Sequence, residues 1–118
     1  MSCISGLLGQ VGTEVEAQLR PVLGGLTGFL VSGYLPQSWV FATETEVVTF
    51  HVDSRGHASV VEGRAQNPDV SIETSHAMLS AALRTRNASS VPKGPLNIIP
   101  HTSKGKAAFQ FLRGKLGL

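Results

Sequence analysis

Cysteine is almost absent from this chain of 118 residues, in which Cys3 is the only one. A single thiol excludes an internal disulfide and a zinc site built from several cysteines. The first residues also lack the basic start and the clear small-residue cleavage site of a secretory signal. We therefore expect a reducing compartment, with the cytoplasm as the location.

Aromatic residues and net charge are scarce as well. The chain has one Trp, one Tyr and five Phe, and its 10 Lys and Arg against 8 Asp and Glu leave a formal net charge of +2. A nucleic-acid surface needs an extended basic footprint or interleaved aromatic side chains. No nucleic-acid partner is therefore expected.

Long hydrophobic runs are also missing. The longest apolar stretch, residues 22–35, is interrupted by glycines and is too short for a bilayer core, which predicts no transmembrane segment. Hydrophobic residues nevertheless make up 42% of the sequence. That proportion allows residues 1–118 to form a single domain with its own core.

Strand patterns dominate the middle of the chain. Apolar and polar residues alternate in four short segments and predict strands over residues 38–43, 47–53, 57–63 and 70–74. We expect these strands to follow one another as a meander. The turn that begins at Asp53 has the residue types of a tight hairpin, so the second and third strands should pair antiparallel, with Gly56 at positive φ.

A fifth strand is expected later in the chain. Leu96, Ile98 and Ile99 form a short apolar segment, which Pro100 ends or holds at a sheet edge because proline has no amide to donate.

Helical spacing begins before the strands. Thr13, followed three residues later by Glu16, fits a capping box that opens the first helix. Pro21 should kink this helix or restart it as a second one, because it removes an internal amide. Pro36 ends it.

Two further helices are expected after the fourth strand. We expect Ser75 to be the N-cap of a helix that runs to about Arg86. Thr102 or Ser103 should be the N-cap of a last helix. The sequence thus indicates an α+β fold of order α-β-β-β-β-α-β-α. Its five-stranded curved sheet would be antiparallel, or mixed at one edge, with helices packed on one face.

This order resembles the sterol-carrier-protein type 2 family, the nonspecific lipid-transfer fold, over about Trp39 to the C-terminus. The segments that carry the resemblance are Ser38-Trp39-Val40-Phe41, Thr49-Phe50-His51-Val52-Asp53 leading to Gly56, and Pro68-Asp69-Val70-Ser71-Ile72. The resemblance implies a non-catalytic module that holds a fatty acid, acyl-CoA or sterol-like lipid in a cavity between sheet and helices. It implies no cofactor and no metal.

The chain departs from the family between the second helix and the last one. There the family has an aromatic-rich segment and a Gly-Lys-Leu strand, whereas residues 86–95 are rich in Ser, Gly and Pro. Ala108-Phe109 and Gly114-Lys115-Leu116 could instead form that segment, in which case no terminal helix would follow. The N-cap at Ser103 and the continuous apolar stripe favour a helix.

Seven apolar side chains are candidates for the lining of such a cavity. The candidates are Phe50, Val60, Ile72, Met78, Leu83, Phe109 and Leu112. A plain core position is the more common role for any one of them. If they do form a cavity, an acyl chain of a dozen carbons would gain on the order of 10 kcal/mol before ordering costs, at about 0.8 kcal/mol per buried methylene.

Three other interpretations stay open. A structural or interaction module could form a homodimer through residues 19–35. His51 and Asp53, with His101, have the order of a two-histidine, one-carboxylate iron site, but the chain has too few strands for the double sheet of such enzymes. The basic residues near the end could attract coenzyme A phosphates or an anionic membrane, or form an ordinary solvated face. These are Lys104, Lys106, Arg113 and Lys115.

Overall fold

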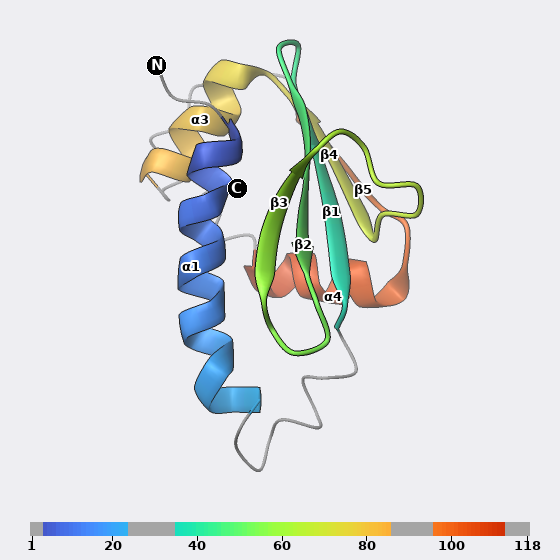
Figure 1. Cartoon of the computed structure of the whole chain (residues 1–118). Coiled ribbons are helices and arrows are strands. Elements are labelled where there is room, and N and C mark those ends of the chain that lie inside the picture. Colours follow the sequence, from blue (N-terminus) through green and yellow to red (C-terminus); the bar gives the residue numbers. More distant parts are fainter. Residues whose placement is uncertain (1–3, 24–34, 86–95, 113–118) are drawn as a thin grey trace.

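The computed structural model describes residues 4–23, 35–85 and 96–112, and for residues 18–23 and 111–112 the backbone alone. Helices and strands follow one another in the expected order (Figure 1). The helices are α1 (Ile4–Leu23), α3 (His76–Thr85) and α4 (Ser103–Leu112). The strands are β1 (Gln37–Ala42), β2 (Val47–Val52), β3 (Ala58–Glu62), β4 (Val70–Thr74) and β5 (Leu96–Pro100). The α+β class and the element order are confirmed.

The five strands form one mixed sheet in the order β3-β2-β1-β4-β5. The pairs β1–β2, β2–β3 and β4–β5 are antiparallel, and β1–β4, in the middle of the sheet, is parallel. The expectation of a meander through all four early strands is wrong. The first three strands are joined by hairpins, but β4 pairs with the free edge of β1 and not with β3.

The segment between β3 and β4, residues 63–69, makes this crossing possible. Gly63, at φ 98°, donates its amide to the Val47 carbonyl at 2.9 Å. The Thr49 hydroxyl then donates to the Gly63 carbonyl at 2.8 Å and accepts from the Ala65 amide at 3.0 Å. Thr49 faces away from the helices, so these bonds hold the start of the crossing segment against the sheet's other face. Figure 1 shows the yellow-green segment leaving β3 and reaching the start of β4.

The turn between β2 and β3 is the predicted hairpin. Gly56 has φ 85° and donates to the Asp53 carbonyl at 3.0 Å. The Asp53 carboxylate also accepts from the amides of Arg55 and His57, at 2.8 and 2.9 Å. The antiparallel pairing of these strands is therefore confirmed.

The beginning of α1 differs from the expected capping box. The helix starts at Ile4, so Thr13 lies inside it and donates its hydroxyl to the Gly9 carbonyl at 3.2 Å. Glu16 does not reach back to its own helix, and accepts instead from the Ala58 amide of β3 at 2.7 Å. The helix bounds include Pro21, so α1 neither ends nor restarts there. The expected continuation toward Pro36 lies outside the described residues.

The two later helix starts agree with the sequence. The Ser75 hydroxyl accepts from the Met78 amide at 3.1 Å, which makes Ser75 the N-cap of α3. The Thr102 hydroxyl accepts from the Gly105 amide at 3.0 Å and caps α4. Residues 103–112 are therefore helical, and the alternative of a strand-containing segment is wrong for this part. Residues 113–118, with Arg113 and Lys115, lie outside the described part of the chain.

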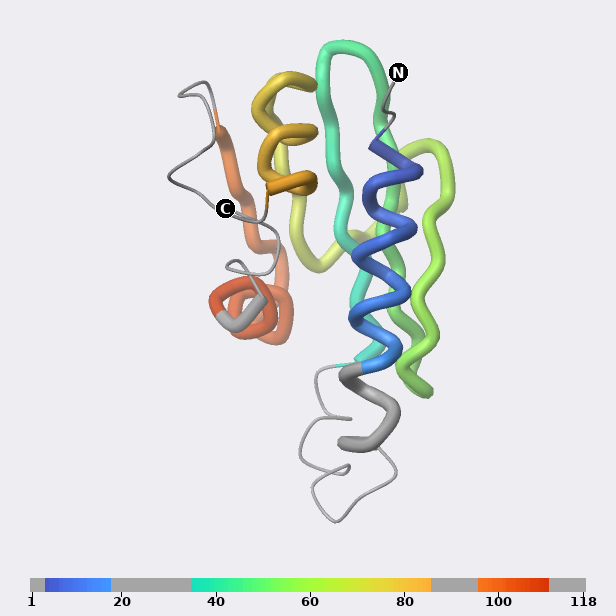
Figure 2. The backbone as a smooth tube through the Cα atoms, turned by 90° about the vertical axis from the view of Figure 1, so that its left-hand side faces the viewer, coloured from blue at the N-terminus to red at the C-terminus, as the bar shows by residue number. Residues whose placement is uncertain are grey.

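The described helices cover one face of the sheet, which we call the inner face. In Figure 2, α1 passes in front of the sheet, with α3 at its side and α4 below α3. The strand register places alternate residues on this face, among them Trp39 beside Phe50 and Phe41 beside Ile72. Their side chains and those of the helices form one buried cluster. The cluster contains Ile4, Leu8, Val11, Val15, Trp39, Phe41, Val48, Phe50, Val52, Val70, Ile72, Leu79, Leu83 and Phe109.

Candidate ligand-binding face

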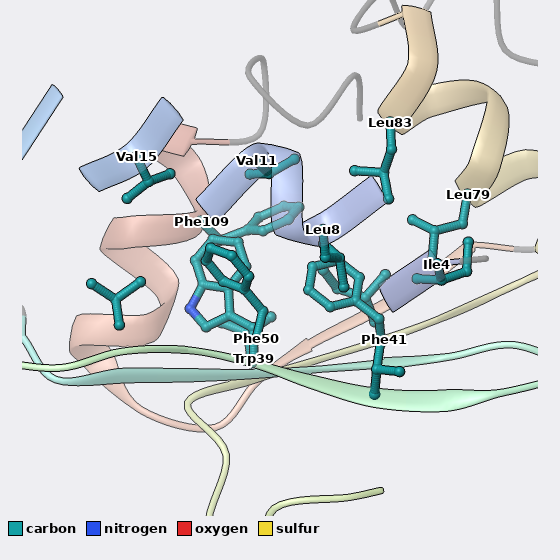
Figure 3. Close-up of a cluster of buried hydrophobic side chains, with 14 residues drawn as sticks. Ile4, Leu8, Val11, Val15, Trp39, Phe41, Phe50, Leu79, Leu83 and Phe109 are labelled. Carbon is teal, nitrogen blue, oxygen red and sulfur yellow. The ribbon is translucent and has the colours of Figure 1, made fainter. Parts of the chain in front are cut away.

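The inner face brings most of the predicted lining residues together. Phe50 of β2, Ile72 of β4, Leu83 of α3 and Phe109 of α4 all belong to the buried cluster. Val60 of β3 is partly buried and packs against it. Figure 3 shows the labelled members converging from sheet and helices into the same space. Ligand contact at these positions stays a prediction.

Two predicted residues stand apart from this group. Met78 is half-buried, and its sulfur accepts a hydrogen bond from the Thr74 hydroxyl at 3.2 Å. The bond ties the side chain of α3 to the end of β4. The side chain of Leu112 lies outside the described part of the structure.

Trp39 is a central residue of this face that the sequence analysis missed as a site candidate. Its ring lies 5.6 Å from that of Phe109, at an interplanar angle of 49°. Its indole N–H donates to the buried Gln37 side-chain oxygen at 2.8 Å, so the ring enters the core with its polar group satisfied. The alternation of Gln37, Trp39 and Phe41 in β1 is the signal that could have identified it.

The first half of α1 was missed as well. Ile4, Leu8, Val11 and Val15 recur at helical spacing, and all are buried against the sheet. Figure 3 shows them pointing from α1 toward the strands. The capping-box expectation at Thr13 concealed this pattern, because it placed the helix start after three of these residues.

The turn between β1 and β2 places two carboxylates at the ends of two helices. The Glu46 carboxylate accepts from the Ile4 amide at 2.7 Å, at the start of α1. The Glu44 carboxylate accepts from the His76 amide at 3.0 and 3.1 Å, at the start of α3. Hydrogen bonds from its own backbone amide and from that of His76 hold the pKa of Glu44 below its usual value. The His76 ring also lies 3.6 Å from the Glu46 carboxylate.

Asp69 joins β1, β4 and the start of α4. Its carboxylate accepts from the Ser38 amide at 2.9 Å and from the Thr102 hydroxyl at 2.8 Å. The Lys104 ammonium lies 3.8 Å from the same carboxylate and donates to the Pro36 carbonyl at 2.6 Å. Lys104 thus contacts two groups of the fold, and its attraction to a coenzyme A phosphate or a membrane surface stays a prediction.

The residues considered for an iron site are not brought together. His51 shares a hydrogen bond with Ser38 at 2.8 Å, and His101 shares one with Ser71 at 2.9 Å. Strands β1 and β4 lie between the two histidines. Within the described ranges, no three His, Cys, Asp or Glu side chains are close enough to hold a metal ion.

None of the helices in the described part of the chain is long and apolar enough to span a membrane. The fold and the inner face define an α+β protein in which helices cover one side of a mixed five-stranded sheet over an apolar cluster.

Comparison with known proteins finds a similarity among solved structures. No family model matches the chain, and no curated protein matches it. Among solved structures, the chain is similar to one titled "UbiJ-SCP2 Ubiquinone synthesis protein". The match has a TM-score of 0.46 at 10% sequence identity, and it covers 91% of this chain and 89% of that chain.

Proposed function

We propose that this chain is a non-catalytic module that binds an apolar, acyl-type ligand, such as a fatty acid or an acyl-CoA, on the inner face of its sheet. One observation carries the proposal: lining candidates from separate strands and helices meet in a single apolar cluster. Phe50, Ile72, Leu83 and Phe109 come from four different elements and are nearly fully buried in it.

The chemistry of such a ligand requires little more than this cluster. An acyl chain is held by burial of its methylenes, worth about 0.8 kcal/mol each, and needs no general acid, base or nucleophile. Met78 is half-buried, and Val60 is partly buried and packs against the cluster. Both suit a wall that adapts to its ligand, because the Met78 side chain is flexible and the Val60 side chain is not fully enclosed. Selectivity between ligands would then depend on chain length and shape.

Lipid bound to the purified protein is the first test. Native mass spectrometry, followed by organic extraction, should find a co-purified acyl ligand, and the apo protein should take up a fluorescent fatty acid. A protein that carries no lipid and takes up no probe is not a carrier. The same spectrum gives the oligomeric state, and therefore also tests the alternative of a ligand-free homodimeric module.

Adjacent residues of β3 offer a matched pair for the second test. Val60 faces the cluster, whereas Val61 faces away from it and is 58% exposed. Val60→Phe should fill space near the ligand and weaken probe binding by about tenfold, which is about 1.4 kcal/mol. Val61→Phe should leave binding unchanged. Equal effects of the two substitutions would place the ligand elsewhere.

A further inference from the structure

One short turn fixes the starts of both helices that lie over the upper part of the inner face. The turn, residues 43–46, joins β1 to β2, and Figure 2 shows it reaching between the beginnings of α1 and α3. Glu46 binds the first described amide of α1, and Glu44 binds the first amide of α3. We refer to residues 43–46 as the clamp turn.

Both contacts join a carboxylate to an amide at the start of a helix. An amide at a helix N-terminus has no partner within the helix, and a carboxylate there gains from the charge and from the helix dipole. The acceptor for Ile4 lies 42 residues away in sequence, so this bond links helix to sheet and is not a local cap. At α3 the carboxylate of Glu44 adds to the local cap by Ser75.

The clamp turn is itself held in shape by Thr43. Its hydroxyl accepts from the amides of Thr45 and Glu46, at 3.3 and 3.1 Å, and its amide donates to the Glu46 carbonyl at 2.9 Å. These bonds fix the backbone from which both glutamates extend. Both carboxylates therefore extend from the same rigid turn. A change in the backbone of this turn would move both carboxylates and so alter their contacts with α1 and α3.

Beyond the clamp turn, α1 is fastened at a second place. Glu16 accepts from the Ala58 amide at the start of β3, three turns further along the helix. The segment of α1 between Ile4 and Glu16 carries the apolar residues that cover β2 and β3, and α3 packs against α1. If the hydrogen bonds of Glu44 and Glu46 break while that of Glu16 remains, the first turns of α1 and α3 can move away from the sheet and expose the inner face.

We propose that the clamp turn is a latch, whose release from α1 and α3 is the step that admits an apolar ligand to the inner face. The proposal rests on the proposed function for its ligand, and on the geometry of Glu44 and Glu46 for its mechanism. Folded proteins open locally at free energies that lie below that of global unfolding, and helix ends are among the places where such opening begins.

The first experiment needs no lipid. Hydrogen exchange of the ligand-free protein is compared between the wild type and the variants Glu46→Ala, Glu44→Ala and Glu46→Gln. Loss of the Glu46 carboxylate should speed exchange of the amides of residues 8–11 by about tenfold, the effect expected for one charge-assisted hydrogen bond. Glu44→Ala should do the same for residues 79–83. Glu46→Gln keeps the shape and an acceptor, and should give an intermediate effect.

Glu73→Ala is the matched control. Glu73 is an exposed glutamate of β4, and the strand register places it on the face opposite the helices, beside Ala42. Its loss should leave exchange in both helices unchanged. If the Glu44 and Glu46 variants exchange like the control, the latch does not exist.

The second experiment tests the admission of ligand by stopped-flow uptake of a fluorescent fatty acid. The Glu46→Ala variant should take up the probe several times faster than the wild type, with an equilibrium affinity within about twofold of it. Faster exchange with an unchanged uptake rate would overturn the role of the latch in admission, while lipid binding would stand. If the wild type binds no probe at all, the proposed function is refuted. That result comes from equilibrium binding of the probe and does not depend on the exchange data.

Discussion

A methyl group added at Gly105 gives the sharpest test of how α4 meets the sheet. Gly105 is buried in the first turn of α4, against the backbone of Asp69. A Cβ built there would overlap the Asp69 carbonyl oxygen and lie 2.9 Å from both its carbonyl carbon and its Cβ. These atoms cannot rotate away, because the Asp69 carbonyl also accepts the His101 amide at 2.8 Å.

The direction of the effect follows from two opposing contributions. Gly→Ala inside a helix normally stabilises by about 1 kcal/mol, through helix propensity. At Gly105 the helix must instead move away from β4, and such overpacking costs about 1 to 3 kcal/mol, with further loss from the weakened Asp69 hydrogen bonds. We expect Gly105→Ala to lower the free energy of unfolding by about 1 to 3 kcal/mol in total.

Two other glycines give a graded comparison by urea unfolding. A Cβ at Gly9, which is exposed on α1, meets no atom within 4 Å, so Gly9→Ala should stabilise by about 0.5 to 1 kcal/mol. At Gly12 it would lie 3.1 Å from the Ala58 Cβ, which predicts a value between the two. If Gly105→Ala proves as stable as Gly9→Ala, α4 does not pack on β4 in the way described.

Three further predictions concern single side chains. Asp69→Ala removes the acceptor shared by β1 and α4, and should lower the free energy of unfolding by about 3 kcal/mol, whereas Lys104→Met should change it by less than about 1 kcal/mol; urea unfolding measures both. The pKa of Asp53 is held below its usual value, chiefly by the amide of His57. Asp53 therefore stabilises the fold above its unfolded-state pKa, and this contribution is lost as the pH falls through its lower folded-state pKa. The acid transition of Asp53→Asn, followed by circular dichroism below about pH 4, should be flatter, and an unchanged slope would contradict the assignment. Ser75→Ala leaves the Met78 amide without its cap and should destabilise by about 1 kcal/mol, with Ser75→Asp restoring most of it.

The features that the sequence predicted well are those set by local patterns. The turn from Asp53 to Gly56 depends on neighbouring residues alone, and so do the caps at Ser75 and Thr102. Strand alternation also placed Phe50 and Ile72 on one face, because side chains of a strand alternate whatever the strand pairs with.

The features that the sequence did not predict depend on residues far apart. The start of α1 is capped by Glu46, which lies 42 residues later in the sequence. No motif near Ile4 indicates this cap. Strand β4 could pair with the free edge of β3 or with that of β1, and it pairs with β1. The alternation of apolar and polar residues in β4 would be the same in either arrangement. Trp39 belonged to a recognised strand, but its contact with Phe109 arises only when α4 folds back onto the sheet.

The parallel pairing of β1 with β4 has a consequence for synthesis of the chain. While the polypeptide is made from its N-terminus, β1, β2 and β3 can assemble as soon as they emerge, but one edge of β1 keeps its backbone amides and carbonyls unpaired until Val70–Thr74 arrives. An unpaired strand edge of this kind can pair with the strands of other chains. A product truncated before Val70 should therefore aggregate, whereas one that extends past Thr74 should have its middle strand protected on both sides.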